Sequence, residues 1–121
     1  MAENTEKEDE RQLLGIIIED NSIIDRSHDM LERCRKRGIT EESFSDKDCR
    51  TLYREMLNHA KNKPDFDLNT LNQYLNEKNI VLGNDVDGNN LQFLCGLIDK
   101  IGSTAHFEHY RNRVIANAAR R

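Results

Sequence analysis

Histidine and cysteine side chains are the residues of this chain whose types and spacing could hold a metal ion. His106 and His109 lie three residues apart in a segment that we expect to be helical, and the chain also contains Cys34, Cys49 and Cys95. A tetrahedral zinc site needs four converging ligands, and neither a CxxC nor an HExxH spacing is present. Cysteines on the apolar side of a helix behave as small hydrophobic residues. We therefore expect no metal site.

The acidic stretch NDVDGNN has the composition of a calcium-binding loop. Such a loop needs an acidic residue first, a glycine at position six and a glutamate at position twelve. With Gly88 in the sixth position, the first ligand would be Gly83 and the twelfth Leu94. The register that begins at Asp85 lacks both the glycine and the closing glutamate. We interpret the stretch as a connecting loop.

Catalytic chemistry has no motif in this sequence. Neither GxxxxGK[ST] nor GxGxxG occurs, so the phosphate-binding loops of nucleotide-dependent enzymes are missing. No serine or cysteine has a recognisable base and orienting group near it in the sequence. We expect His28 and His59 at a solvent edge or an interface rather than as general bases. The sequence therefore predicts no catalytic residue and no cofactor-binding residue.

The charge of the chain is unevenly distributed. The net charge is −4, but the first ten residues hold five acids and one base, so the remainder is neutral. A neutral body lacks the excess of lysine and arginine that nucleic-acid binding requires. We interpret the one basic cluster as a complement to the dipole of its own helix, and the alternative is a contact for an acidic partner or a nucleic-acid backbone. The cluster consists of Arg33, Arg35, Lys36 and Arg37.

The cysteine count and the apolar runs indicate the compartment. An odd number of cysteines, each in an expected helix, favours free thiols in a cytosolic protein over disulfides. The longest apolar run, residues 13–18, is far shorter than the roughly 18–20 residues that span a bilayer. The acidic start is the reverse of a signal peptide. We expect a cytoplasmic protein without a membrane contact.

A pair of helices is expected to organise the fold. Ser45 is a good N-cap, and Asp48 could complete a capping box with it. Pro64 would end this helix, and Asp67 would cap the next. Two amphipathic helices joined by a short turn cannot bury both apolar faces, so other helices must pack on them. The apolar face of the first helix recurs at helical spacing through Cys49, Leu52, Tyr53, Met56, Leu57 and Ala60.

Four further helices complete the prediction, and we find no convincing strand. They run from Asp9 to about Glu19, from Asn21 or Ser22 to Gly38, from Asn89 or Asn90 to Gly102, and from Ser103 or Thr104 to the end of the chain. The sequence therefore predicts an all-α fold, a compact bundle of about six helices. Residues 1–8 would be a disordered acidic lead, residues 9–102 a helical head domain and residues 103–121 a C-terminal helix.

Four segments, taken in order, resemble the N-terminal domain of the DnaB-type hexameric replicative DNA helicase. ERQLLGIIIEDNSIID is similar to that family's opening E-x-x-(V/L)-L-G, apolar residues and D-N, and SFSDKDCRTLYREM to its segment ending H-R-x-I-F-x-x-M. FDLNTLNQYL is similar to P-I-D-x-x-T-L-x-x-x-L, and STAHFEHYRNRVIANAARR to S-A-A-N-I-x-x-Y-A-x-x-V-R-x-x-A-x-x-R. The matching positions are Glu10, Leu13, Leu14, Gly15, Asp20, Asn21, Phe44, Arg50, Leu52, Tyr53, Met56, Asp67, Thr70, Leu71, Leu75, Ser103, Ala105, Tyr110, Val114, Ala118 and Arg121.

The chain also departs from the family pattern. The run ERCRKRGITEE, residues 32–42, is longer than the family's usual connection, so the resemblance does not explain the basic cluster. Cys49 stands where the family has histidine, and residues 83–90 are a divergent version of its glycine-containing loop. The ATPase domain with its phosphate-binding loop is absent from this sequence, so the helicase reaction cannot be carried out by these residues.

The resemblance implies a non-catalytic domain that assembles as a dimer or hexameric collar and docks primase during DNA replication. ATP and Mg²⁺ would be bound by the motor domain of the full-length helicase, and DNA would be contacted only there. The C-terminal helix would be the first arm of a helical hairpin, cut before its second arm. From the spacing of residues on one face of this helix, we expect self-association to use Phe107, Tyr110, Arg111, Val114 and Ala118. The alternatives are the helicase-binding domain of a primase and a small nucleic-acid-binding protein.

Overall fold

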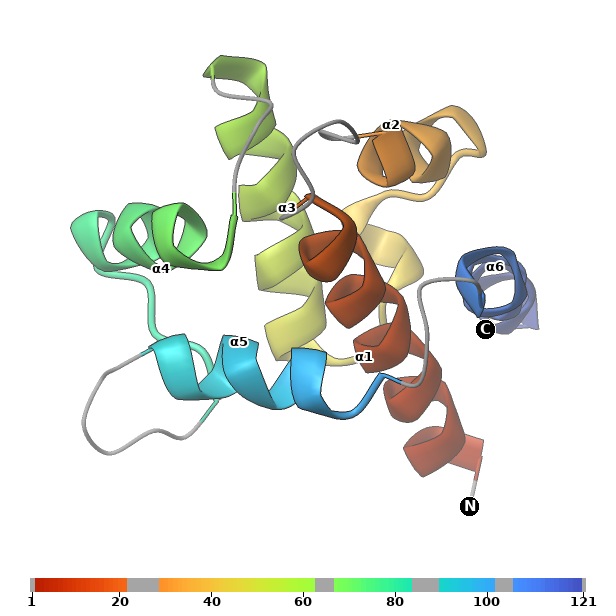
Figure 1. Cartoon of the computed structure of the whole chain (residues 1–121). Coiled ribbons are helices and arrows are strands. Elements are labelled where there is room, and N and C mark those ends of the chain that lie inside the picture. The colour runs from red at the N-terminus through yellow and green to blue at the C-terminus, as the bar shows by residue number, and fades with distance from the viewer. Residues whose placement is uncertain (1, 22–28, 63–66, 84–89, 102–105, 121) are drawn as a thin grey trace.

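The computed structural model of the chain is built from helices, and the residues it describes include no strand (Figure 1). It describes residues 2–21, 29–62, 67–83, 90–101 and 106–120. The α-helices are α1 (Ala2–Asn21), α2 (Asp29–Lys36), α3 (Lys47–Asn62), α4 (Leu68–Glu77), α5 (Asn90–Asp99) and α6 (Phe107–Arg120), and a 3-10 turn, η1 (Glu41–Ser43), lies before α3. The predicted all-α fold of six helices is confirmed.

Helix α1 is the centre of the bundle, and α2, α3, α5 and α6 all pack against it. Figure 1 shows the C-terminal end of α5 beside the middle of α1, and α6, seen nearly end-on, to the right of α1. The apolar run in the middle of α1 covers every side of the helix, which is the pattern of a helix buried all round. The residues of this run that are fully buried are Leu13, Leu14, Ile16, Ile17 and Ile18.

Helix α1 begins earlier than the sequence pattern indicated. Residues 2–8, which we expected to belong to a disordered lead, form its first turns. Acidic side chains near a helix N-terminus are favoured by the helix dipole. The first turns are also tied to the rest of the fold, because Lys7 Nζ lies 3.7 Å from Asp46 Oδ1. The division into a head domain and a C-terminal helix stays a prediction.

Glu10 fixes the start of α3. Its carboxylate is 1% exposed and accepts hydrogen bonds from the Ser45 N–H and Oγ, both at 2.8 Å, and from the Asp46 N–H at 3.0 Å. Ser45 is therefore not the N-cap of α3, and the predicted capping box with Asp48 is wrong. The cap is Asp46, whose Oδ2 accepts from the Cys49 N–H at 3.3 Å.

The predicted faces of α3 and α4 are correct. Asp67 caps α4, because its Oδ1 accepts from the Thr70 N–H at 2.8 Å and its own N–H donates to Thr70 Oγ1 at 2.9 Å. Leu71 and Leu75 are buried on the inner side of α4. Along α3, the stripe is fully buried at Cys49, Leu52, Tyr53 and Met56 and half-buried at Leu57 and Ala60.

Helix α5 begins at Asn90, which is one of the two start positions expected from the sequence. Its buried side chain accepts from the Leu82 N–H at 2.8 Å and donates to Asn76 Oδ1 at 2.9 Å and to the Ile80 carbonyl at 2.6 Å. This amide therefore holds both sides of the connection between α4 and α5. Several expected features lie outside the described residues: the caps at Ser22, Asn89, Ser103 and Thr104, the terminators Pro64 and Gly102, His28, and most of the NDVDGNN stretch.

Gly15 is expected to be intolerant of any side chain, because it lies where α1 crosses α5. A Cβ at this position would lie 2.6 Å from the Leu97 carbonyl oxygen and 2.9 Å from Ile101 Cγ2. Gly15→Ala should lower the free energy of unfolding by about 1–3 kcal/mol, although alanine favours a helix by about 1 kcal/mol. Urea denaturation followed by circular dichroism measures the change.

Gly96→Ala is the matched control for Gly15→Ala. Gly96 lies inside α5, and a Cβ there would meet no heavy atom within 4 Å. This substitution should raise the free energy of unfolding by about 0.5–1 kcal/mol, through helix propensity alone. Equal effects of the two substitutions would contradict the close crossing of α1 and α5.

Glu10→Ala should destabilise the fold by about 2–3 kcal/mol, because three partly buried donors lose a charged acceptor. The control is Glu8→Ala two residues earlier, where an exposed side chain accepts a single long hydrogen bond from Gln12. The free energy of unfolding of Glu8→Ala should remain within about 0.5 kcal/mol of that of the parent chain. Chemical denaturation of both variants measures the difference, and similar values would argue against the role of Glu10.

Candidate functional site

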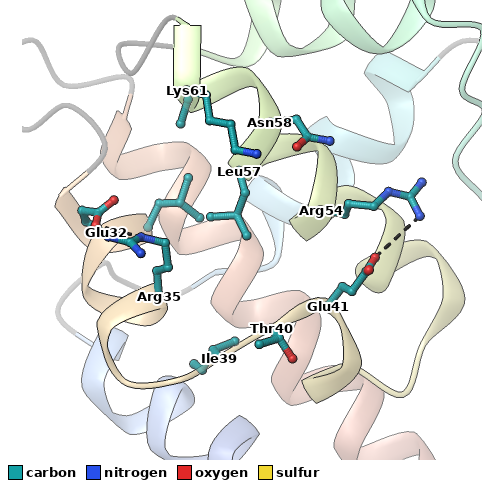
Figure 2. A pocket seen from close by; sticks show the side chains of 11 residues that line it. Glu32, Arg35, Ile39, Thr40, Glu41, Arg54, Leu57, Asn58 and Lys61 are labelled. Atoms are coloured by element: carbon teal, nitrogen blue, oxygen red, sulfur yellow. Dashed lines mark hydrogen bonds and ion pairs between the residues drawn. The ribbon is translucent and has the colours of Figure 1, made fainter.

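An open groove lies between α2 and the C-terminal half of α3 (Figure 2). It has a volume of about 700 Å³, and the connection from α2 to η1 closes one end. Its apolar lining comes from three parts of the chain, namely Leu31, Ile39, Leu57 and Ala60. Its polar rim is formed by Glu32, Arg35, Thr40, Glu41, Arg54, Asn58 and Lys61.

The connection that shapes this groove is held by backbone geometry. Gly38 has a φ of 84°, a left-handed conformation that favours glycine and ends helices. The Gly38 N–H donates to the Arg35 carbonyl at 3.0 Å, and the Ile39 N–H donates to the Cys34 carbonyl at 3.1 Å. The buried Tyr53 hydroxyl then donates to the Ile39 carbonyl at 2.8 Å. The predicted terminator Gly38 is thus confirmed, and the groove wall is tied to α3.

Ion pairs occupy both acids of the groove rim. Glu32 pairs with Arg35 on the same helix. Glu41 lies 3.6 Å from Arg54 Nη1, across the gap between η1 and α3. Lys61 makes no ion pair with any residue that the structure describes. The unpaired charge at this rim is therefore positive.

The four residues of the predicted basic cluster do not form one patch. The Arg33 guanidinium lies over the Phe107 ring, with its Cζ 4.9 Å from the ring centroid, so it packs between α2 and α6. Arg35 is engaged with Glu32. Lys36 and Arg37 are exposed and have no ion pair within the described ranges. The role of the cluster as a contact for an acidic partner stays a prediction.

The residues expected to mediate self-association lie mainly inside the chain. Phe107, Arg111 and Val114 have exposed fractions of only 2%, 6% and 0%, because this side of α6 packs on α1. Tyr110 and Ala118 are half-buried. The five side chains therefore form no single exposed patch on one chain. Their role in self-association is not tested by this burial and stays a prediction.

Helix α6 is anchored to α1 by a buried acid. Asp9 is 5% exposed, and its Oδ2 accepts from Arg113 Nε at 2.9 Å and from Asn117 Nδ2 at 3.1 Å. The sequence offers no signal for this contact, because the partners lie more than a hundred residues apart. The bond fixes which side of α6 faces the core.

A second polar cluster joins α3 to α4. Glu55 is 5% exposed and lies within 3.5 Å of Arg54, Tyr74 and Lys78. Burial raises the pKa of Glu55, but the hydrogen bonds and positive charges of Arg54 and Lys78 together lower it below its usual value. The carboxylate therefore stabilises the fold at neutral pH, and this contribution is lost as the pH falls through the folded-state pKa. His59 stacks on the Tyr74 ring at 4.6 Å, so this cluster positions helices.

Two further observations on the described residues concern metal ligands and long apolar helices. Across the described ranges, no three or more histidine, cysteine, aspartate or glutamate side chains are placed to hold a metal ion together. Within the same ranges, no helix has the length and apolar character needed to cross a membrane. The three cysteines are free thiols, of which Cys34 and Cys49 are buried and Cys95 is half-buried.

One family model, described as the DnaB-like helicase N terminal domain, matches residues 2–116, nearly the whole chain. The chain belongs to this family. The resemblance carried by the four sequence segments is thus confirmed, and only the N-terminal domain of the helicase is matched. No curated protein matches the chain. The groove residues and the Asp9–Arg113 contact lie within the matched range of the DnaB-like domain, and Asn117 lies just after it.

Sequence reasoning missed the groove of this DnaB-like domain. The only signal was the apolar stripe of α3, which we expected to be buried along its full length. Leu57 and Ala60 continue that stripe but stay half-exposed, since no described helix covers the groove side of α3 near its C-terminal end. An apolar stripe in the sequence does not show how much of its length is covered by other helices.

Thiol reagents should distinguish the three cysteines of the DnaB-like domain. Burial raises the pKa of Cys34 to about 12, and burial together with the charge of Asp46 raises the pKa of Cys49. A raised pKa leaves less of the reactive thiolate, so one thiol per chain should react quickly with Ellman's reagent at pH 8. Cys95→Ser should remove this fast phase. Two or three fast thiols in the folded parent chain would contradict the burial of Cys34 and Cys49.

Proposed function

We propose that this DnaB-like domain is the non-catalytic N-terminal domain of a hexameric replicative DNA helicase. It would mediate assembly of the ring and dock primase during DNA replication in the cytoplasm. The observation that carries the proposal is the family match over residues 2–116. The same match favours a helicase domain over the helicase-binding domain of a primase. ATP, Mg²⁺ and DNA would be bound by a motor domain of the full-length protein.

The hydrogen bonds of the buried polar side chains support a structural role for this domain. Asp9, Glu10 and Asn90 are almost completely buried, and each accepts or donates hydrogen bonds that join two elements of the chain. Polar groups that bind a substrate would instead converge on a cavity. The groups of this domain fix the relative positions of helices, as a rigid assembly module requires.

The half-exposed apolar groups of α6 are the proposed contacts for ring assembly. Tyr110 and Ile115 lie at opposite edges of the buried side of α6. Ala118 lies in the middle of the same side, near the C-terminal end of the helix. A helix that packed beside α6 at the first edge would cover Tyr110, and a helix at the other edge would cover Ile115. The outward side of α6 carries polar residues and alanines, including Asn112 and Ala116.

Light scattering coupled to gel filtration tests both parts of the proposal in one experiment. The chain is measured over a concentration series, alone and mixed with the helicase-binding region of its cognate primase. A second chain, extended through the next arm of the expected hairpin, is measured in the same way. We expect a dimer or larger ring that strengthens with the extension, and a further mass increase with primase.

Variants of α6 sharpen this experiment. Tyr110→Ala should weaken self-association about tenfold, equivalent to about 1.4 kcal/mol, whereas Asn112→Ala on the outward side should leave it unchanged. Strictly monomeric chains at both lengths would contradict the proposed assembly. An unchanged mass in the presence of primase would contradict docking, independently of the assembly result.

A further inference from the structure

We propose that the groove between α2 and α3 is a docking site for an amphipathic helix of another protein, one that carries acidic side chains beside an apolar stripe. The proposal stands apart from ring assembly and primase docking. It rests on the geometry and charge of residues 31–61, and the failure of either proposed role would leave it unaffected.

The shape of the groove fits a helix. Two helices form its long walls, and it is open along one side (Figure 2). Sites for small molecules bury roughly 70–90% of the ligand surface, which a one-sided groove cannot do. An amphipathic helix instead needs an open channel that accepts apolar side chains at successive turns.

The apolar lining supplies places for such side chains. Leu57 and Ala60 lie three residues apart on α3, so they share one side of that helix. Leu31 and Ile39 face them from the opposite wall. These four residues come from elements that are already held together by the Tyr53 hydrogen bond to the Ile39 carbonyl. The groove is therefore formed before any partner arrives, which lowers the entropic cost of binding.

The rim charges select an acidic partner. Glu32 and Glu41 are each neutralised by an arginine of the rim. The Lys61 side chain extends beside Leu57 over the groove (Figure 2), and it has no ion pair with a described residue. Lys36, one helical turn after Glu32, does not line the groove but is a second exposed cation of α2 that has no ion pair with a described residue. Carboxylates of a docked helix would complement these cations, and a basic helix would be repelled.

The test is a titration of the isotope-labelled full chain, monitored by two-dimensional amide NMR. The probe is a synthetic helical peptide of about four turns with leucines at i, i+3 and i+7 and glutamates on both flanks. Its twin has a lysine at each glutamate position. The acidic peptide should shift the amide signals of Ile39, Leu57 and Lys61 and bind about tenfold more tightly than the basic twin, a difference of about 1.4 kcal/mol.

Charge reversal in the groove provides the decisive comparison. Lys61→Glu should lower the affinity for the acidic peptide about tenfold and raise the affinity for the basic twin. A misfolded chain could not produce this gain in affinity. The matched control is Lys100→Glu, which makes the same charge change at an exposed position just after α5. This control should bind both peptides as the parent chain does.

Four results of the peptide titrations would overturn the proposal. They are the absence of binding by either peptide, equal affinity for the acidic and basic peptides, amide shifts confined to surfaces outside the groove, and identical behaviour of Lys61→Glu and Lys100→Glu. Shifts of the groove signals on simple dilution of the free protein would also overturn it, because they would show that a second copy of the chain is the occupant.

Discussion

A helix that is apolar on every side must be covered on every side, and α1 imposes this constraint on the whole chain. The run from Leu13 to Ile18 cannot face water along any direction. Four other helices pack around it, and the absence of a side chain at Gly15 lets α5 approach its backbone closely. The topology of the bundle follows from the need to cover this one segment, and α4 joins through α3 and α5.

Burial of apolar surface does not by itself fix the angles and registers of these helices. That role falls to a few buried polar groups. Glu10 holds the turn that begins α3, Asp9 holds α6, and Asn90 holds the connection between α4 and α5. A buried polar group tolerates few arrangements, because losing its partner costs more free energy than a shift between apolar contacts. The acidic residues of α1 therefore specify the structure as well as making its first turns soluble.

Features of this chain could be predicted from the sequence when the residues that interact lie close together in the chain. The Asp67 cap, the Gly38 terminator and the faces of α3 and α4 depend on residues within one or two turns, and they were predictable. The Ser45 cap was wrong because Glu10, 35 residues earlier in the chain, takes its hydroxyl and amide hydrogens. The groove was not predictable, since an apolar stripe looks the same whether Leu57 is covered or open. The family assignment succeeded because it used four separated segments in order.

The bond between Asp9 and Arg113 spans 104 positions of the chain, and this span has a consequence for biosynthesis. A ribosome releases α1 long before α6, so the side of α1 that α6 will cover remains open while nearly all of the domain is made. Contacts of such long sequence separation form late and slow folding. The nascent chain therefore exposes isoleucine and leucine side chains during most of its synthesis, a period in which chaperone binding or aggregation competes with closure of the bundle.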